Sequence, residues 1–354
     1  MLHLAHGGDI YRNRIEYDFS VSINPIGVHP LVREAYLEGV GELTHYPDPD
    51  CSRLRKAIAA RLGSEAYDEE DMIMGNGASE LIFAATRAAA VRGGCDKKKL
   101  LLVTPGFSEY ERAAQSAGLT AVHYRIGADD GFEVKDDIAD MIDESICLVI
   151  ICNPHNPTGR LIDDKLLDEI TARCEKAGAY LMIDECFINL CEGRKSVLLT
   201  DRRMSDRLIV LRAFTKTFAV PAVRSGYIVC RNDEFVRTVR DMLPCWNLSV
   251  SAYLTSMAAL DITDDYLADS LRLIRDEKQY LKQELSRLGI KVYDSDANFF
   301  LVRTDRDLKT QLMRAGLLIR SFEDNALKNI YRISVGSRQA NQVLINAVEE
   351  IVNG

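Results

Sequence analysis

A series of short apolar runs, separated by amphipathic stretches, constrains the fold of this chain more than any other feature. The runs are mostly apolar on both faces, which is typical of strands buried between two layers of helices. They predict strands at 72–74, 100–104, 121–124, 147–152, 180–184, 208–211 and 226–230. Between two of them, Asp163 at the start and Gly178 at the end bound a helix over 163–177. This alternation predicts a mostly parallel α/β sheet covered on both faces.

The pattern changes after about residue 245. A long amphipathic helix at about 264–288 precedes short strands near 291–293, 298–302 and 331–334, and a final helix follows at about 339–352. This order predicts a smaller α/β domain. A chain of 354 residues suits two domains. We predict a large domain over 45–245 and a small domain formed by 1–44 together with 246–354.

Charge and cysteine content exclude several classes of protein. The 44 Lys and Arg residues against 53 Asp and Glu residues leave a net charge of −9. That surplus argues against binding to nucleic acid or to an anionic membrane surface, although a few arginines could still hold a small anion. The nine cysteines have no C-x-x-C spacing and several lie in apolar runs. We therefore expect buried, reduced thiols, no metal site and no disulfide framework. No signal sequence or membrane-spanning run is present, so we expect a cytoplasmic protein.

Two segments at predicted strand ends carry candidate chemistry. The loop N-P-H-N-P-T-G, residues 153–159, directly follows the strand at 147–152. Open α/β sheets bind ligands at such carboxyl ends, although the loop alone could be a turn. Asp184 closes the strand L-M-I-D, and a single acidic residue there could equally cap a helix or form an ion pair.

Two further segments complete the set. Lys216 follows the strand at 208–211, with Arg224 beyond it, and a lysine there could simply be a surface charge. The segment M-G-N-G-A-S-E, residues 74–80, reads as a strand-to-helix turn. Its glycines and the helix N-terminus would suit a phosphate, although a short glycine loop is a weak signal by itself.

In this order, the four segments resemble fold-type I pyridoxal-phosphate (PLP) enzymes, the aspartate aminotransferase superfamily, over essentially the whole chain. Asp184 follows Asn156 by 28 residues, Lys216 follows Asp184 by 32, and Arg224 follows Lys216 by eight. The resemblance implies PLP as cofactor. It also implies a three-layer αβα large domain with a mostly parallel seven-stranded sheet, plus a smaller α/β domain.

The resemblance assigns catalytic roles to two residues. Lys216 would form the Schiff base with the cofactor and later transfer protons, because a desolvated amine beside other cations has a lowered pKa. Asp184 would pair with the pyridine nitrogen and keep the ring an electron sink. Asn156 would donate to the phenolic oxygen of the cofactor and lie beside the substrate.

The remaining cofactor contacts follow from the same resemblance. Phe107, in T-P-G-F, would stack on the ring. Tyr46, in H-Y-P-D-P, would reach the cofactor of a neighbouring subunit, which implies a homodimer with a shared active site. The phosphate would be held by a larger set of residues, which is Gly77, Ala78, Ser79, Thr215 and Arg224.

The substrate contacts implied by the resemblance are mostly cationic. Arg332, in Y-R-I-S, would take the substrate α-carboxylate in a bidentate pair. Arg320, in L-I-R-S-F, is the candidate for a second anionic group, which would be a phosphate on a small amino-acid substrate. Each arginine could instead be a solvated charge at a strand edge.

Two groups within the superfamily compete for the reaction, namely threonine-phosphate decarboxylases and histidinol-phosphate aminotransferases. The segment A-H-G-G-D, with His6, resembles the decarboxylase pattern A-H-G-G-N, in which the histidine helps to bind the substrate phosphate. D-F-S-V-S-I-N-P-I-G, residues 18–27, resembles D-F-S-x-N-I-N-P-x-G, but Ser22 stands where that pattern has Asn near the substrate phosphate. Phe187 also matches the decarboxylases, since the aminotransferases usually carry a tyrosine there.

We expect decarboxylation of a phosphorylated hydroxy-amino acid, phosphothreonine or phosphoserine, in cobalamin side-chain biosynthesis. The alternative is a class I/II aminotransferase such as histidinol-phosphate aminotransferase. A dinucleotide-binding oxidoreductase is disfavoured because the turn at Gly75 and Gly77 lacks the third glycine of G-x-G-x-x-G. A binding protein that had lost catalysis would be expected to lack Lys216 or Asp184.

Overall fold

A computed structural model describes residues 7–63, 67–200 and 205–354 of the chain. Its main feature is a seven-stranded sheet with strand order β2-β8-β7-β6-β5-β3-β4. Strands β7, β6, β5, β3 and β4 are parallel, whereas β8 runs antiparallel to both β7 and β2. In chain order the strands are β2 (Met72–Gly75), β3 (Lys99–Thr104), β4 (Thr120–Arg125), β5 (Ile146–Cys152), β6 (Tyr180–Asp184), β7 (Leu208–Ala213) and β8 (Gly226–Val229). The predicted mostly parallel sheet is confirmed, and each strand lies within two residues of its predicted bounds.

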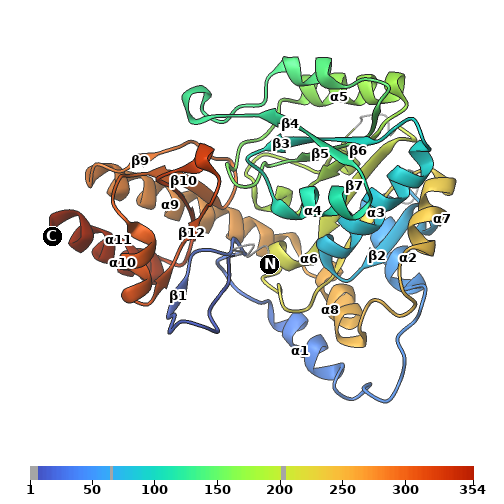
Figure 1. The fold of residues 1–354 in the computed structure, drawn as a ribbon. Coiled ribbons are helices and arrows are strands. Elements are labelled where there is room, and N and C mark those ends of the chain that lie inside the picture. The colour runs from blue at the N-terminus through green and yellow to red at the C-terminus, as the bar shows by residue number, and fades with distance from the viewer. Residues whose placement is uncertain (1–6, 64–66, 201–204) are drawn as a thin grey trace.

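Helices cover both faces of this sheet and make three layers (Figure 1). One face packs against α3 (Gly77–Gly93), α4 (Ser108–Ser116) and α7 (Asp233–Asp241). The other packs against α2 (Ser52–Leu62), α5 (Asp164–Ala177) and α8 (Val250–Leu260). Helix α1 (Pro30–Glu38) lies against α8. Within the described residues, no helix is long and apolar enough to cross a lipid bilayer.

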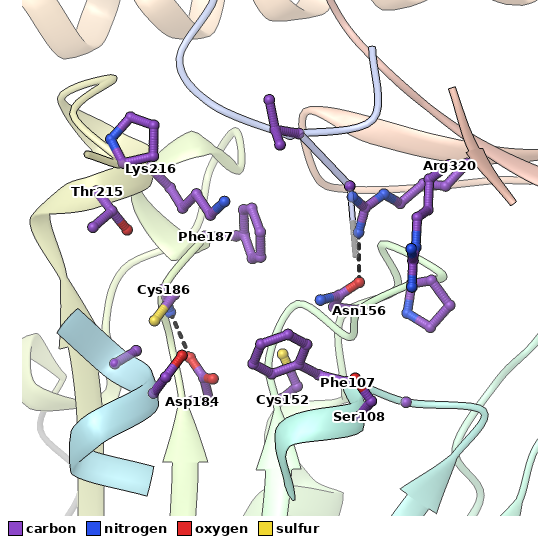
Figure 2. Close-up of a pocket in the computed structure, with 18 of the residues that line it drawn as sticks. Phe107, Ser108, Cys152, Asn156, Asp184, Cys186, Phe187, Thr215, Lys216 and Arg320 are labelled. Carbon is purple, nitrogen blue, oxygen red and sulfur yellow. Dashed lines mark hydrogen bonds between the residues drawn. The ribbon is translucent and has the colours of Figure 1, made fainter. Parts of the chain in front are cut away.

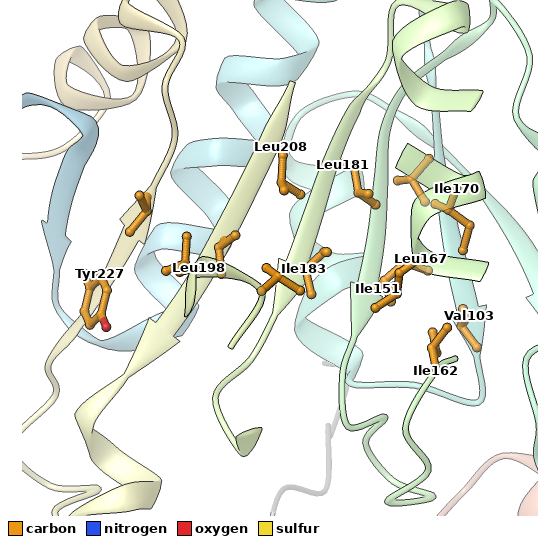
Figure 3. Packing of buried hydrophobic residues seen from close by; sticks show 14 of the residues in the cluster. Val103, Ile151, Ile162, Leu167, Ile170, Leu181, Ile183, Leu198, Leu208 and Tyr227 are labelled. Atoms are coloured by element: carbon orange, nitrogen blue, oxygen red, sulfur yellow. The ribbon is translucent and has the colours of Figure 1, made fainter. Parts of the chain in front are cut away.

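The two faces of the sheet bury separate apolar clusters because successive strand residues point to opposite sides. In β5, Val149 and Ile151 pack toward α5, whereas Leu148 and Ile150 pack toward α3 and α4. Figure 3 shows the α5 side, where Ile151 lies beside Leu167. Seven of the nine cysteines are buried, which agrees with the predicted buried thiols.

Helix α5 shows why the local sequence signals were sufficient. The Asp163 side chain accepts from the Lys165 backbone N–H, which caps the first turn. Gly178 ends the helix with φ of 67°, a left-handed conformation that favours glycine. The helix therefore begins and ends where the sequence indicates.

A third apolar cluster lies around a four-stranded antiparallel sheet with order β12-β13-β10-β9. Its strands are β9 (Lys291–Val292), β10 (Phe299–Arg303), β12 (Arg320–Ser321) and β13 (Ile330–Ser334), and its helices are α9 (Asp264–Arg287), α10 (Leu308–Arg314) and α11 (Arg338–Asn353). A further two-stranded sheet pairs β1 (Tyr17–Asp18) in parallel with β11 (Leu317–Leu318). The expected small α/β region is present, while the domain boundaries at residues 45 and 245 stay a prediction.

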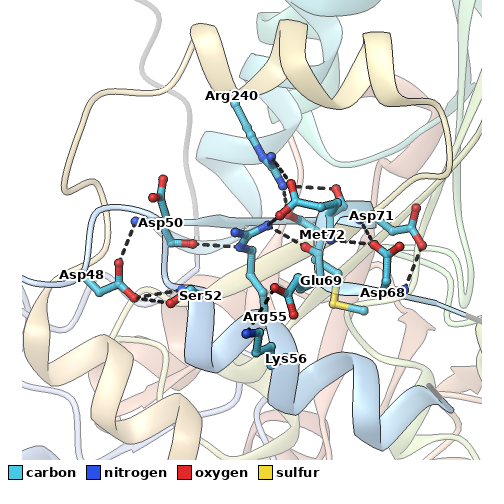
Figure 4. A network of polar contacts seen from close by, with 11 residues as sticks. Asp48, Asp50, Ser52, Arg55, Lys56, Asp68, Glu69, Asp71, Met72 and Arg240 are labelled. Carbon is cyan, nitrogen blue, oxygen red and sulfur yellow. Dashed lines mark hydrogen bonds and ion pairs between the residues drawn. The ribbon is translucent and has the colours of Figure 1, made fainter.

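A polar network fixes the start of β2 (Figure 4). The buried Arg55 of α2 donates to the backbone carbonyls of Asp50 and Glu69, at 2.8 and 2.6 Å. Arg240 of α7 donates to the carbonyl of Met72 at 3.3 Å. These bonds hold one end of β2, and its other end leads into α3 at the candidate site.

Candidate active site

A cavity of about 260 Å³ lies at the carboxyl edge of the parallel strands. Strand β5 ends at Cys152 and β6 at Asp184, and these two residues are partners in the sheet register. Both line the cavity, together with the loop containing Asn156 (Figure 2). This edge is where an open α/β sheet is expected to bind a ligand.

Lys216 reaches the cavity from α6 (Phe214–Thr217), a single turn that follows β7. Its Nζ lies 5.6 Å from the ring centroid of Phe187, as Figure 2 illustrates. Burial, followed by the charge of the nearby Arg332, lowers the pKa of Lys216 to about 8. An amine in this environment is neutral and nucleophilic in a larger fraction of molecules than an ordinary lysine.

Asp184 is a buried carboxylate whose two oxygens are both held in place. Oδ1 accepts from the Cys186 backbone N–H at 3.0 Å, and Oδ2 accepts from Tyr110 Oη at 2.7 Å. A fixed anion that lines the cavity provides a strong partner for a positively charged ring nitrogen.

The start of α3 forms a cradle suited to a phosphate. Gly77 has φ of +79°, and a Cβ there would lie 2.4 Å from Arg224 Nη2, so the guanidinium lies directly over the turn. The next two residues of the helix, Ala78 and Ser79, line the cavity, as does Thr215. Helix N-terminal N–H groups beneath a guanidinium are a common anion site.

Arg332, on β13, forms the opposite wall. Its Nη1 donates to Asn156 Oδ1 at 2.7 Å, and its Nη2 donates to the Ser20 carbonyl at 2.6 Å. Its buried Nε has no hydrogen-bond partner among the described residues. Burial, followed by the charge of Arg320, lowers the pKa of Arg332 to about 9. An unpartnered buried donor and a second cation together favour an anionic ligand here.

Residues 18–24 connect this wall to the lysine. The segment accepts from Arg332 at the Ser20 carbonyl and from the Asn298 side chain at the Ile23 carbonyl. Further along, the Asn24 backbone N–H donates to the Lys216 carbonyl at 3.0 Å. Ser20 itself lines the cavity, so the segment forms part of its boundary.

The structure brings most of the predicted site residues to one cavity. Those that line it are Ala78, Ser79, Phe107, Asn156, Asp184, Thr215, Lys216, Arg224, Arg320 and Arg332. Gly77 adjoins it beneath Arg224. The roles of these residues stay predictions, but their convergence was expected from the sequence order.

Three predicted residues are not part of this group. Ser22 is buried and its Oγ bonds Ser334 Oγ at 2.8 Å. Tyr46 is 80% exposed and its ring lies 4.6 Å from that of Trp246. His6 lies outside the described residues.

Sequence reasoning gave no role to several residues that line the cavity, among them Tyr110, Ser20 and Phe322. Tyr110 lies three residues after Phe107 on the first turn of α4, so helical spacing could have suggested it. Ser20 contributes through its backbone carbonyl, for which side-chain identity carries no signal. Phe322 directly follows β12, a strand of two residues that is too short to show a hydrophobic pattern in the sequence.

Comparison with known proteins agrees with this geometry. Residues 17–348 match the aminotransferase class I and II family. The chain is 28% identical to a threonine-phosphate decarboxylase of Salmonella typhimurium, over 100% of this chain and 98% of that protein. It is 29% identical to a histidinol-phosphate aminotransferase of Clostridium novyi, over 97% of this chain and 92% of that protein.

A solved structure is similar over the same extent. The crystal structure of the histidinol-phosphate aminotransferase from Clostridium acetobutylicum has a TM-score of 0.83 and 26% identity, and covers 95% of this chain and 99% of that chain. The chain therefore belongs to the aminotransferase class I and II family, a family of PLP-dependent enzymes. The cavity has the groups that this cofactor requires, namely an amine of lowered pKa, a buried carboxylate and a phosphate cradle.

Proposed function

We propose that the protein is a carbon–carbon lyase that decarboxylates a phosphorylated hydroxy-amino acid. The proposed substrate is L-threonine O-3-phosphate, or its phosphoserine analogue. With the threonine compound, the products are CO₂ and 1-aminopropan-2-ol O-phosphate, and one proton is taken up at Cα. We place this reaction in cobalamin side-chain biosynthesis.

The observation that carries the proposal is the pairing of Arg320 with Arg332. The two residues are in register across β12 and β13, and both line the cavity that contains Lys216. Two adjacent guanidinium groups favour a substrate with two anionic groups. A phosphorylated amino acid has both a carboxylate and a phosphate, whereas histidinol phosphate has only a phosphate.

Each arginine has a distinct proposed role. Arg332 orients the substrate carboxylate through its Nε edge while Nη1 keeps its bond to Asn156 Oδ1. Arg320 takes the phosphate. Its guanidinium lies 5.5 Å from the Phe322 ring centroid, which limits the positions open to it. His6 would add a contact to the same phosphate.

The cofactor would be bound by residues at the carboxyl edge of the seven-stranded sheet, across the cavity from Arg320 and Arg332. Lys216 Nζ would attach to it, Asp184 would pair with its ring nitrogen, and Phe107 would cover its ring. The cradle beneath Arg224 would hold its phosphate, and Asn156 would donate to its phenolic oxygen. When bound, PLP supplies an electron sink that stabilises negative charge at the substrate Cα. Lys216 Nζ would then return a proton to that carbon.

Phe187 supports decarboxylation over amine transfer. Its ring is buried and lies edge-on to Phe299, with centroids 5.1 Å apart. A tyrosine at this position would offer a hydroxyl beside Lys216, and phenylalanine offers none. The site therefore has one donor fewer than the aminotransferase pattern.

An aminotransferase is the second candidate function. The similarity to the histidinol-phosphate aminotransferases of Clostridium novyi and Clostridium acetobutylicum favours it. The arginine pair would then serve the two carboxylates of an acceptor such as 2-oxoglutarate.

We further propose a cytoplasmic homodimer with a shared active site. Tyr46 is highly exposed, although its ring is held against Trp246, as expected for a side chain that reaches another subunit. Other exposed apolar residues lie nearby in the sequence and include Tyr36, Leu37, Val40 and Leu43. The buried thiols suit a reducing compartment.

The test is an assay of purified, PLP-loaded protein with O-phospho-L-threonine, O-phospho-L-serine and histidinol phosphate. CO₂ release and 2-oxoglutarate-dependent amine transfer are measured in parallel. We expect CO₂ from a phospho-amino acid and little amine transfer. Amine transfer from histidinol phosphate, with no CO₂ from either phospho-amino acid, would overturn the proposal in favour of the aminotransferase.

A further inference from the structure

Tyr110 makes a buried contact that the proposed reaction does not account for. It lies on the first turn of α4 and is 4% exposed. Its Oη donates to Asp184 Oδ2 at 2.7 Å. The other oxygen, Oδ1, accepts from the Cys186 backbone N–H. The carboxylate is therefore anchored from two directions by groups on different elements.

Tyr110 remains a hydrogen-bond donor over the whole working pH range. Burial raises the pKa of its hydroxyl well above the ordinary value, and the charge of Asp184 raises it further. The hydroxyl therefore stays protonated. A buried donor to a charged acceptor is among the stronger hydrogen bonds in a protein.

We propose that Tyr110 is a positioning residue that acts through Asp184 on the ring nitrogen of the cofactor. This inference rests on the proposed pairing of Asp184 with that nitrogen. A donor to the carboxylate disperses its negative charge and makes it a weaker proton acceptor. The shared proton then stays on the ring nitrogen, where it is needed for the electron sink. The same bond keeps Oδ2 aimed at the cavity.

Loss of the hydroxyl would have two consequences. Asp184 would lose its anchor on α4 and keep only its contacts with Cys186, so Oδ2 would be less firmly held. It would also hold the proton more tightly, so the ring nitrogen would carry less positive charge. Both consequences reduce turnover and cofactor affinity, and neither affects how Arg332 and Arg320 bind the substrate.

A purely structural role for the hydroxyl can be separated with a matched control. Tyr180 begins β6, the strand that ends at Asp184, and belongs to the same apolar cluster as Tyr110. It is also 4% exposed. Tyr180→Phe therefore removes a buried hydroxyl from the same core without touching Asp184.

The experiment is a double-mutant cycle with Tyr110→Phe, Asp184→Asn and the double variant. The PLP dissociation constant of the cofactor-free proteins is measured, together with kcat and KM of the loaded proteins. We expect Tyr110→Phe alone to lower kcat about tenfold, to weaken PLP binding several-fold, and to leave KM within about twofold. In the Asp184→Asn background, Tyr110→Phe should change kcat and the PLP dissociation constant by less than about twofold each.

Independent effects that multiply in the double variant would overturn the proposal. So would a Tyr180→Phe variant with equal losses in PLP affinity and kcat, because the effect would then be general destabilisation. PLP affinity does not depend on which substrate is used. If no CO₂ is released but the effects of Tyr110→Phe and Asp184→Asn on PLP affinity are coupled, only the proposed reaction is refuted. If the two effects on PLP affinity are independent, only the role of Tyr110 is refuted.

Discussion

Arg320 and Arg332 are directly paired in the register of β12 and β13, and both side chains line the cavity that contains Lys216. Burial lowers the pKa of both. Like charges are rarely brought together in a protein interior without an anion to neutralise them. Under the proposed function, the pair would divide the recognition of a substrate with two anionic groups.

Substitutions of the two arginines should have different consequences. Arg332→Ala should lower kcat/KM about a hundredfold for O-phospho-L-threonine and for L-threonine alike, because both have the carboxylate. Arg320→Ala should lower kcat/KM for the phosphorylated substrate only, and the preference for it should largely disappear. Steady-state kinetics with both substrates check this. Equal losses for both substrates in Arg320→Ala would show that this residue does not bind the phosphate.

The cradle at Gly77 gives a prediction with a close control. Gly77→Ala places a Cβ 2.4 Å from Arg224 Nη2, so the exposed guanidinium must move away from the phosphate site. We expect PLP affinity to fall about tenfold. Gly131 also has positive φ, at +63°, but nothing lies within 4 Å of its Cβ position. Because both glycines have positive φ, each substitution should cost about 1 kcal/mol of stability. Gly131→Ala should leave PLP affinity unchanged. Fluorescence titration with PLP and urea unfolding measure the two quantities. Equal PLP affinities for the two variants would remove Arg224 from the cradle.

The lowered pKa of Lys216 predicts a pH-dependent stability. Its folded-state pKa of about 8 lies below the ordinary 10.5, so the unfolded chain binds more protons between these values. The free energy of unfolding should therefore rise with pH across this window. At pH 7, cofactor-free Lys216→Met should be more stable than the original chain by about 3 kcal/mol. By pH 10 the difference should fall below about 1 kcal/mol.

Urea unfolding at both pH values measures this difference. The exposed Lys98 provides the control, since Lys98→Met should leave stability nearly unchanged at either pH. A Lys216→Met variant with the same advantage at pH 7 and pH 10 would contradict the assigned shift.

Substitution of Phe187 should change the ratio of decarboxylation to amine transfer. Phe187→Tyr adds a hydroxyl to a buried ring whose centroid lies 5.6 Å from Lys216 Nζ, and that hydroxyl must find a partner. Under the proposed function, the ratio of CO₂ release to amine transfer should fall about tenfold. Phe187→Leu controls for loss of the ring and its contact with Phe299, and should lower both activities together. An unchanged ratio in Phe187→Tyr would show that this position does not select the reaction.

Much of the fold could be predicted because its signals are local. Most of the central strands are buried on both faces, and the caps of α5 lie at its ends in sequence. The two-residue strand β9 lies within the predicted 291–293, but the equally short β1, β11 and β12 were not predicted, since two residues show no periodicity by themselves. Their pairing depends on tertiary contacts, such as the Phe19 backbone N–H donating to the Leu318 carbonyl.

The site residues also divide into those that local sequence could predict and those that depend on tertiary packing. Lys216 and Asp184 could be predicted because they follow strands in a specific order. The contact of Tyr110 with Asp184 joins residues 74 apart and depends on how α4 packs on the sheet. Ser22 was expected at the substrate phosphate from its position in a motif, but its Oγ is paired with Ser334. Sequence order therefore predicted which residues follow the strands into the cavity, whereas packing determines which side chains contact them.

Asn24 provides a final prediction, because it holds the turn that carries Lys216. Its side-chain Nδ2 donates to the Thr217 carbonyl at 2.9 Å and to Ser270 Oγ at 2.7 Å. Asn24→Ala would leave both buried acceptors without this donor, at a cost of about 2 kcal/mol in stability. The Lys216 turn would also loosen, so we expect slower attachment of PLP, measured by stopped-flow absorbance after mixing with cofactor-free protein. Asn325→Ala, at an exposed position, is the control. A stable Asn24→Ala variant with an unchanged attachment rate would show that the lysine is positioned without this segment.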